Sequence, residues 1–201
     1  MYVPKHFVVD DLKWIRAFMD EHRFATLVTV LDGEPFATHL PLIYDPHPEP
    51  YGTLLGHVAR ANPHWQTFAV PQLAIFTGPH AYVSPTWYRS AGPAVPTWNY
   101  TAVHAYGRAR ILEEPADVRD LLVRLTDREE SSLEPRYTVE AQDGDYLDHM
   151  MRQIVAFEIP IEKLEAKAKL SQNRTPEERE RVARTLGGEL EALMQELSLP
   201  K

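Results

Sequence analysis

Two stretches of this chain concentrate side chains that could contact a flat, polar ligand. Segments 78–88 and 96–107 are rich in aromatic rings, histidines, hydroxyls and prolines. A solvated loop has little use for so many rings, and a plain core strand has little use for so many histidines. The mixture indicates a wall against a flat molecule with polar edges. Equally, clustered rings are typical of core or dimer-interface anchors.

The segment from Gly56 to Trp65 is predicted to be a strand end followed by a helix start. Free backbone N–H groups and the positive end of a helix attract an anion there, and His57, Arg60 and Asn62 add donors. These residue types in this order indicate a phosphate site. The alternative is that Asn62 caps the helix ahead of Pro63 while Arg60 is solvated.

The residues from Thr38 to Pro41 lie on a predicted strand. Alternation sends Thr38 and Leu40 to one face and His39 to the other. Pro41 lacks the N–H that a sheet ladder needs, so the strand is expected at an edge. Such an edge, with unpaired N–H groups beside a histidine, could bind the polar rim of a ring. The alternative is an edge strand protected by proline and nothing more.

A further polar segment, 169–174, precedes a predicted helix and has no helical periodicity. Its donors suit a phosphate or a carbonyl group of an isoalloxazine ring. The alternative interpretation is a solvated linker.

Several chemistries lack their sequence signature. The nine histidines show neither His-Glu-x-x-His nor His-x-His spacing, so no metal site is predicted. Without cysteine, the chain has no disulfide, thiolate nucleophile or cysteine-bound metal centre. A Gly-x-Ser-x-Gly elbow and a glycine-rich nucleotide fingerprint are also missing. No residue stands out as an obligatory general acid or base, although histidines such as His39 and His104 often serve as bases.

Length and charge limit the function classes further. The 201 residues favour one main domain. With 29 acidic and 21 basic residues, the net charge of −8 repels nucleic acid over most of the surface. No charged-then-apolar leader precedes Asp10, and no apolar run reaches the length of a membrane span. A soluble cytoplasmic protein is therefore expected.

The elements that must position these residues are mostly strands. Residues 24–30 alternate as a strand does, Asp32-Gly33 supplies a hairpin turn, and 35–44 is expected to be the returning strand. The other expected strands are 52–59, 73–78, 98–112 and 155–161. Residues 81–84 are expected either to begin a further strand or to continue the one over 73–78. Closely spaced strands with short helices between them favour an antiparallel barrel, so the fold class is mainly β with peripheral helices.

Helices are expected from Asp10 or Asp11 to about Arg23, over 62–68, from 115 onwards, over 146–154, and twice near the C-terminus. There, Thr175 with Glu178 forms a capping box, and Gly187-Gly188 ends the first of the two helices. We predict a barrel domain over 1–165, with helices inserted at about 115–152. A polar segment and two helices follow over 166–201, packed on the barrel or on a dimer partner.

Six ordered blocks span nearly the whole chain: 1–7, 34–41, 56–63, 78–88, 96–107 and 169–174. Together they resemble the PaiB-like family of FMN-binding negative transcriptional regulators. The resemblance implies an FMN-binding split β-barrel of antiparallel Greek-key type, related to pyridoxamine 5′-phosphate oxidase. It also implies a homodimer with FMN held between the subunits.

The resemblance assigns three groups of residues to the cofactor. Thr38, His39 and Leu40 would face the flavin ring, and His57, Arg60 and Asn62 would bind the phosphate. Trp98, Asn99, His104, Gln172 and Arg174 would approach from either subunit. The paired cationic phosphate ligands of the oxidase are reduced here to Arg60 with help from histidine.

The predicted function is that of an FMN-binding homodimer of the PaiB type, with negative regulation of transcription as its role. Direct contact with DNA is disfavoured by the net charge. The first alternative is a flavin-dependent oxidoreductase or flavin reductase acting on a small molecule, because the flavin itself carries out hydride chemistry. The second is a module that binds haem or another flat ligand.

Overall fold

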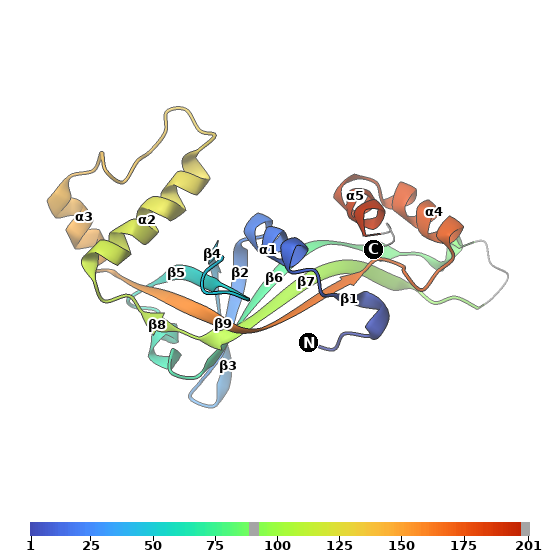
Figure 1. Cartoon of the computed structure of the whole chain (residues 1–201), viewed down its shortest axis with the longest axis horizontal. Helices are drawn as coiled ribbons and strands as arrows, with labels where there is room; N and C mark the ends of the chain where they lie inside the picture. Colours follow the sequence, from blue (N-terminus) through green and yellow to red (C-terminus); the bar gives the residue numbers. More distant parts are fainter. Residues whose placement is uncertain (89–92, 198–201) are drawn as a thin grey trace. The chain divides into compact units, whose positions relative to one another are not determined.

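The computed structural model describes residues 1–88 and 93–197, which form strands, α-helices and short 3-10 helices (Figure 1). The strands are β1 (Val8–Val9), β2 (Phe24–Leu31), β3 (Glu34–Pro41), β4 (Ile43–Asp45), β5 (Thr53–Ala59), β6 (Pro71–Val83), β7 (Thr97–Arg108), β8 (Arg110–Ile111) and β9 (Ile154–Lys169). The α-helices are α1 (Leu12–Glu21), α2 (Pro115–Glu130), α3 (Gly144–Met151), α4 (Pro176–Leu186) and α5 (Gly188–Glu196). Short 3-10 helices are η1 (Lys5–Phe7), η2 (Pro63–Thr67) and η3 (Pro85–Trp87).

The strands form one sheet in the order β3-β2-β6-β7-β9-β5-β4, and β1 and β8 pair with β9. The pairs with an assigned register, such as β2 with β3 and β5 with β9, are antiparallel. The expected mainly β class with peripheral helices is confirmed.

The β2–β3 hairpin forms where the sequence predicts it. Asp32 and Gly33 adopt positive φ angles of 52° and 85°, the geometry of a two-residue hairpin turn, and Leu31 pairs with Glu34 across it. Gly33 suits this geometry because it has no Cβ.

The predicted returning strand over 35–44 is wrong in one respect, because the chain leaves β2 after Pro41. The N–H of Leu42 still donates to the carbonyl of Arg23 at 2.9 Å, and Leu42 is buried. The following residues form β4, in which Ile43 pairs with Leu55 of β5. The hydrophobic pattern continues across this change of partner, so alternation alone did not reveal it.

Two further strand predictions need correction. The strand expected at 155–161 is longer and extends to Lys169 as β9. Of the two possibilities for 81–84, continuation of the preceding strand is the one observed, because β6 runs unbroken to Val83. The expected strand over 98–112 is divided into β7 and β8.

The helix ends confirm the predicted caps. Asp11 Oδ1 accepts a hydrogen bond from the backbone of Lys13 at 2.9 Å at the start of α1. Thr175 accepts from the N–H of Glu178 at the start of α4, and Gly187, with a φ of 66°, ends that helix.

The chain divides into two compact units. Unit one comprises residues 1–18, 76–104 and 165–201, and unit two comprises 19–75 and 105–164. The predicted division into 1–165 and 166–201 stays a prediction.

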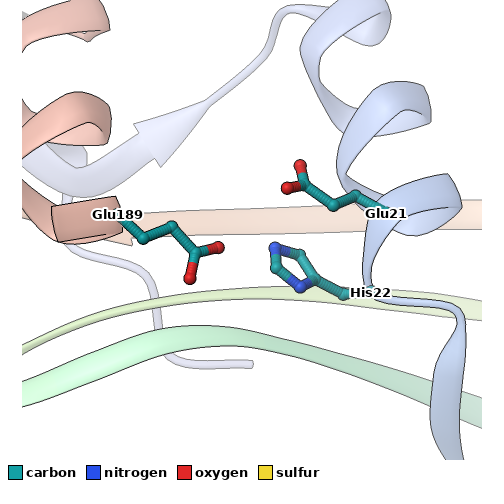
Figure 2. Close-up of side chains that lie close together, drawn as sticks. All are labelled: Glu21, His22 and Glu189. Atoms are coloured by element: carbon teal, nitrogen blue, oxygen red, sulfur yellow. The ribbon is translucent and has the colours of Figure 1, made fainter.

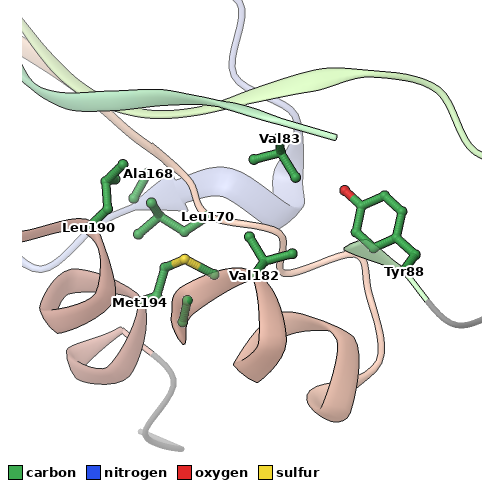
Figure 3. Close-up of a cluster of buried hydrophobic side chains, with 8 residues drawn as sticks. Val83, Tyr88, Ala168, Leu170, Val182, Leu190 and Met194 are labelled. Atoms are coloured by element: carbon green, nitrogen blue, oxygen red, sulfur yellow. The ribbon is translucent and has the colours of Figure 1, made fainter. Parts of the chain in front are cut away.

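In unit one, α4 and α5 cover an apolar cluster. Val182 of α4 and Leu190 and Met194 of α5 lie against Val83 and Leu170, and all five are buried (Figure 3). Burying aliphatic side chains of this size contributes about 1.5–3 kcal/mol each, so the cluster holds the two C-terminal helices in place.

In unit two, α2 covers one face of β5 and β9. Leu121 and Leu125 of α2 are buried against Ile43, Leu55 and Ala156. The other face of β5 turns Leu54 and Val58 into the core. No helix in the described part of the chain is long and apolar enough to cross a membrane.

Replacing Gly107 by Ala is expected to destabilise the protein. A Cβ there would overlap the carbonyl oxygen of Pro160 and lie 2.7 Å from Ile159 Cγ2, so strands would have to shift. Overpacking of this kind lowers the free energy of unfolding by about 1–3 kcal/mol, measurable by urea denaturation. The matched control is Gly144→Ala at the start of α3, where nothing lies within 4 Å; equal losses in both variants would contradict this account.

Candidate functional site

The outer edge of β3 is a free sheet edge in unit two. Among the described strands, β3 has the single neighbour β2 and ends the strand order. Leu31 and Glu34 flank the two-residue turn and therefore exchange backbone hydrogen bonds. Because hydrogen-bonded pairs recur every second residue, this turn determines which residues of β3 bond to β2 and which direct their backbone groups outward.

The backbone groups of β3 alternate between β2 and the open edge. Those directed to β2 belong to Glu34, Phe36, Thr38 and Leu40, and those directed outward belong to Pro35, Ala37, His39 and Pro41. The bond from the N–H of Leu42 to the carbonyl of Arg23 agrees with this alternation, because Leu42 follows Leu40 by two residues.

Both prolines of β3 therefore fall on outward positions. Proline has no N–H, so within Glu34–Pro41 the outward donors are the amides of Ala37 and His39. The expectation that Pro41 marks an edge strand is confirmed. The open edge presents two neighbouring donors between proline-protected ends.

The side chains of β3 alternate as the sequence predicts. Leu40 is 4% exposed and belongs to the core. His39 lies on the exposed face, where its Nδ1 is 3.0 Å from Thr26 Oγ1. Thr38 is half-buried on the same side as Leu40.

A polar network extends inward from Thr38. Asn62 Nδ2 donates to Thr38 Oγ1 at 3.0 Å, and Thr38 Oγ1 lies 2.9 Å from His64 Nδ1. Asn62 Oδ1 also accepts from the N–H of His64 at 3.0 Å, which caps η2. The alternative role of Asn62 as a helix cap is thus confirmed, and Asn62 additionally bonds to Thr38.

The network ends at Gln72, which is 1% exposed. Gln72 Oε1 lies 2.9 Å from His64 Nε2, and Gln72 Nε2 donates to the carbonyls of Thr67 at 2.8 Å and Val70 at 2.9 Å. His64 is fully buried, and this burial lowers its pKa, while the contact with Gln72 acts in the opposite direction. Both polar side chains are therefore satisfied inside the unit.

Sequence reasoning did not assign His64 or Gln72 to the site. A signal was present for Gln72, since it alternates with Ala74 and Phe76, whose side chains are buried. A polar residue at an inward strand position needs a partner, and His64 is that partner.

Arg60 binds main-chain carbonyls. Its Nε donates to the carbonyl of Arg152 at 2.8 Å and its Nη2 to that of Ile154 at 2.7 Å. Its own carbonyl accepts from Trp65 Nε1 at 3.0 Å. The exposed guanidinium also lines a cavity of about 490 Å³ together with residues at the starts of α2 and β9.

His57 lies on β5, opposite Ala156 of β9, and burial lowers its pKa. Of the three residues expected to bind the phosphate, Arg60 and Asn62 bond to different groups, and His57 lies on β5. Their assignment to a phosphate stays a prediction.

The remaining predicted residues belong to unit one. Trp98 is 52% exposed, and its ring lies 6.2 Å from that of Tyr82 in an edge-on arrangement. Burial lowers the pKa of His104, as does the N-terminal amino group, while Glu165 acts in the opposite direction.

Three other polar side chains of unit one take part in its own folding. Asn99 is buried and accepts from Ser171 Oγ at 3.2 Å. Gln172 donates to the carbonyl of Ala168 and accepts from the N–H of Leu170, which closes the turn after β9. The guanidinium of Arg174 stacks 4.0 Å above the ring of Tyr88. The segment 169–174 is thus a folded turn, and a cofactor role for these residues stays a prediction.

The acidic and histidine side chains in Figure 2 come from different units. Glu21 and His22 lie at and just after the end of α1, in unit two, whereas Glu189 belongs to α5 of unit one.

Comparisons with known proteins match this chain over most of its length. A family model described as "Putative FMN-binding domain" matches residues 1–163. "Protease synthase and sporulation protein PAI 2" of Bacillus subtilis (strain 168) is 40% identical over 176 residues, covering 87% of this chain and 83% of that protein. The resemblance inferred from the six sequence blocks is confirmed.

Two solved structures share the fold. The flavocytochrome Anf3 from Azotobacter vinelandii has a TM-score of 0.62 at 16% identity, over 87% of this chain and 73% of that one. The conserved hypothetical protein Rv2991 from Mycobacterium tuberculosis has a TM-score of 0.59 at 17% identity, over 88% and 94%. The expected split-barrel fold class is confirmed.

Acid is expected to destabilise the protein through the half-buried His57. The folded-state pKa of His57 is lowered by burial from its ordinary value of 6.5, so the unfolded chain takes up a proton more readily. The free energy of unfolding therefore falls as the pH drops below the unfolded value. Urea denaturation between about pH 8 and about pH 5 should show a smaller fall for His57→Gln than for the unchanged protein, and identical slopes would contradict this.

Proposed function

Because this chain belongs to the FMN-binding domain family, we propose that it binds FMN along the open edge of β3, as a homodimer, and acts as a negative regulator of transcription. The cofactor follows from the family. The position of the flavin, the dimer and the regulatory role are the proposal.

The observation that carries this placement is the pair of outward amides at Ala37 and His39. The flavin ring is flat and has carbonyl groups along one rim, which accept hydrogen bonds from backbone N–H groups. Two such donors, at Ala37 and His39, could bind these carbonyl groups. Pro35 and Pro41 on either side lack an N–H and therefore oppose pairing of this edge with a further strand.

The donor set around this edge fits FMN. Thr38 and Asn62 add a hydroxyl and an amide to the backbone donors, as the ring or the ribityl hydroxyls require. Arg60 supplies the positive charge that a phosphate needs, and its two carbonyl contacts hold the guanidinium in a fixed orientation.

Bound FMN would supply hydride and electron transfer. The residues of this chain would bind and orient the ring. A second copy of the chain would cover the bound ring and exclude water.

A cluster of rings on unit one supports the dimer. Tyr82 of β6 and Trp98 of β7 are 45% and 52% exposed, and the ring of His80 lies 6.3 Å from that of Trp98. Exposed aromatic clusters of this kind mark contact surfaces, and tryptophan and tyrosine are enriched in interface cores. We propose that the second copy covers this cluster, defined by His80, Tyr82 and Trp98.

We propose that most of the surface does not contact DNA, because the net charge of −8 repels the DNA phosphates. Retardation of one promoter fragment but not of random DNA would support a regulator that contacts DNA. Reduction of the bound flavin by NADH or NADPH, with no effect on transcription, would instead favour an oxidoreductase.

Ala37→Pro is expected to weaken FMN binding. Proline removes one outward N–H but leaves the ladder to β2 intact, as Pro35 and Pro41 already do. The loss of one hydrogen bond should raise the Kd by about tenfold, measured by quenching of flavin fluorescence. Ala37→Ser, which keeps the N–H, is the control, and an unchanged Kd for the proline variant would refute this placement.

The role proposed for Arg60 can be tested by comparing FMN with riboflavin. Arg60→Ala should weaken binding of FMN and leave that of riboflavin, which has no phosphate, nearly unchanged. Equal effects on both ligands would assign Arg60 a role in folding.

Trp98→Lys is expected to dissociate the dimer. A charge placed at the centre of the aromatic cluster would be buried without a partner, which opposes association. Sedimentation of the variant should give a monomer, whereas Trp98→Phe should remain a dimer. A dimeric lysine variant would place the interface elsewhere.

A further inference from the structure

We infer that buried His64 sets the direction of the Thr38 hydroxyl proton, and thereby the pattern of donors and acceptors that Thr38 and Asn62 present to a ligand. This inference rests on the proposed function, because it takes the flavin to lie beside Thr38. It assigns a positioning role to His64 and a specificity role to the pair formed by Thr38 and Asn62.

The orientation of the Gln72 amide is fixed by its surroundings. Its Nε2 faces the carbonyl oxygens of Thr67 and Val70 at 2.8 and 2.9 Å, and these oxygens accept only. The nitrogen must therefore lie on that side, which leaves the oxygen Oε1 facing His64.

The tautomer of His64 follows from this orientation. Because Gln72 Oε1 is an acceptor, His64 Nε2 carries the proton and donates it across 2.9 Å. In the neutral ring the other nitrogen, Nδ1, is then an acceptor. The hydroxyl of Thr38, 2.9 Å away, must donate to it.

Asn62 determines how many hydrogen bonds the Thr38 hydroxyl can still make. Its Oδ1 accepts from the backbone N–H of His64, so its Nδ2 donates to Thr38 Oγ1. Thr38 is left with one lone pair and Asn62 with one N–H on adjacent atoms. This acceptor beside a donor is complementary to a ligand edge with an N–H next to a C=O, which is the imide edge of a flavin ring.

Protonation of His64 would reverse one half of this pattern. With a proton on Nδ1, His64 becomes the donor to Thr38 Oγ1, and the Thr38 proton must point away from it. The pair then presents two donors, one of which opposes the N–H of the imide. A ligand with an imide edge binds well to neutral His64 and poorly to its protonated form.

The side chains around His64 carry no charge that would titrate with it. Its ring contacts Phe36 and Thr38 of β3, Phe68 after η2 and Gln72 of β6, and its backbone bonds to Asn62 and Thr67; all of these side chains are uncharged. Burial lowers the pKa of His64 below 6.5, so the neutral form prevails near neutral pH and the reversal occurs in acid.

The tautomer can be measured without any ligand. Nitrogen-15 NMR of the imidazole should show a protonated Nε2 and an unprotonated Nδ1 for His64 at neutral pH. A protonated Nδ1 would overturn the inference, whatever the protein binds.

The second measurement is the Kd for FMN as a function of pH in Thr38→Ser, Thr38→Val and the unchanged protein. The serine keeps the hydroxyl and should keep the full weakening in acid, whereas valine has no hydroxyl and should lose the part that depends on His64. We expect acid to raise the Kd about tenfold more in the serine variant than in the valine variant. The phosphate of FMN also titrates near pH 6, as phosphate monoesters do, but it does so equally in both variants.

The outcomes separate the two proposals. If the unchanged protein fails to bind FMN at every pH, the proposed function is wrong and this role falls with it. If FMN binds and the serine and valine variants respond equally to acid, the inference about His64 is wrong and the proposed function stands.

Discussion

The two-residue turn at Asp32 and Gly33 fixes the phase of β3 against β2, and the geometry of the site depends on that phase. In a strand with a side-chain period of two, a slip of one residue exchanges the two faces and the two backbone edges. The slipped strand would direct Pro35 and Pro41 toward β2, where each would remove a ladder hydrogen bond. It would also turn Thr38 away from Asn62 and expose Leu40. The positive φ angles of the turn, the prolines and the buried leucine thus all specify the same register.

With β3 in this register, the polar side chains of His64 and Gln72 are buried and need hydrogen-bond partners. Leaving one of them without a partner would cost about 1–3 kcal/mol, a large part of the stability of a typical domain. His64 and Gln72 meet this requirement through each other and through the carbonyls that follow η2. The same bonds order the protons along the chain from Gln72 to Thr38. The hydrogen bonds that satisfy the buried side chains therefore also determine which donors and acceptors Thr38 and Asn62 present to a ligand.

The sequence carries most of the fold and only part of the site, and particular residues explain the difference. Turn residues, caps and edge prolines act locally, so the β2–β3 hairpin, the caps at Asp11 and Thr175 and the edge position of β3 could be predicted. The length of β9 was missed although Ala166 and Ala168 alternate with Lys167 and Lys169, because short alanine side chains give a weak hydrophobic signal.

The site depends on contacts between residues far apart in the chain, which no local pattern encodes. Arg60 was expected to bind a phosphate, but its two carbonyl partners lie more than ninety residues away, at Arg152 and Ile154. Asn99 and Gln172 have the residue types of ligand donors, yet Ser171 and the turn after β9 already engage them. Residue type alone therefore does not reveal which polar side chains already have a partner inside the chain. Thr38 and Asn62 differ from these residues, because their mutual hydrogen bond and the bond from Thr38 to His64 leave one acceptor and one donor for a ligand. The outward amides of β3 likewise face no further strand in the described part of the chain.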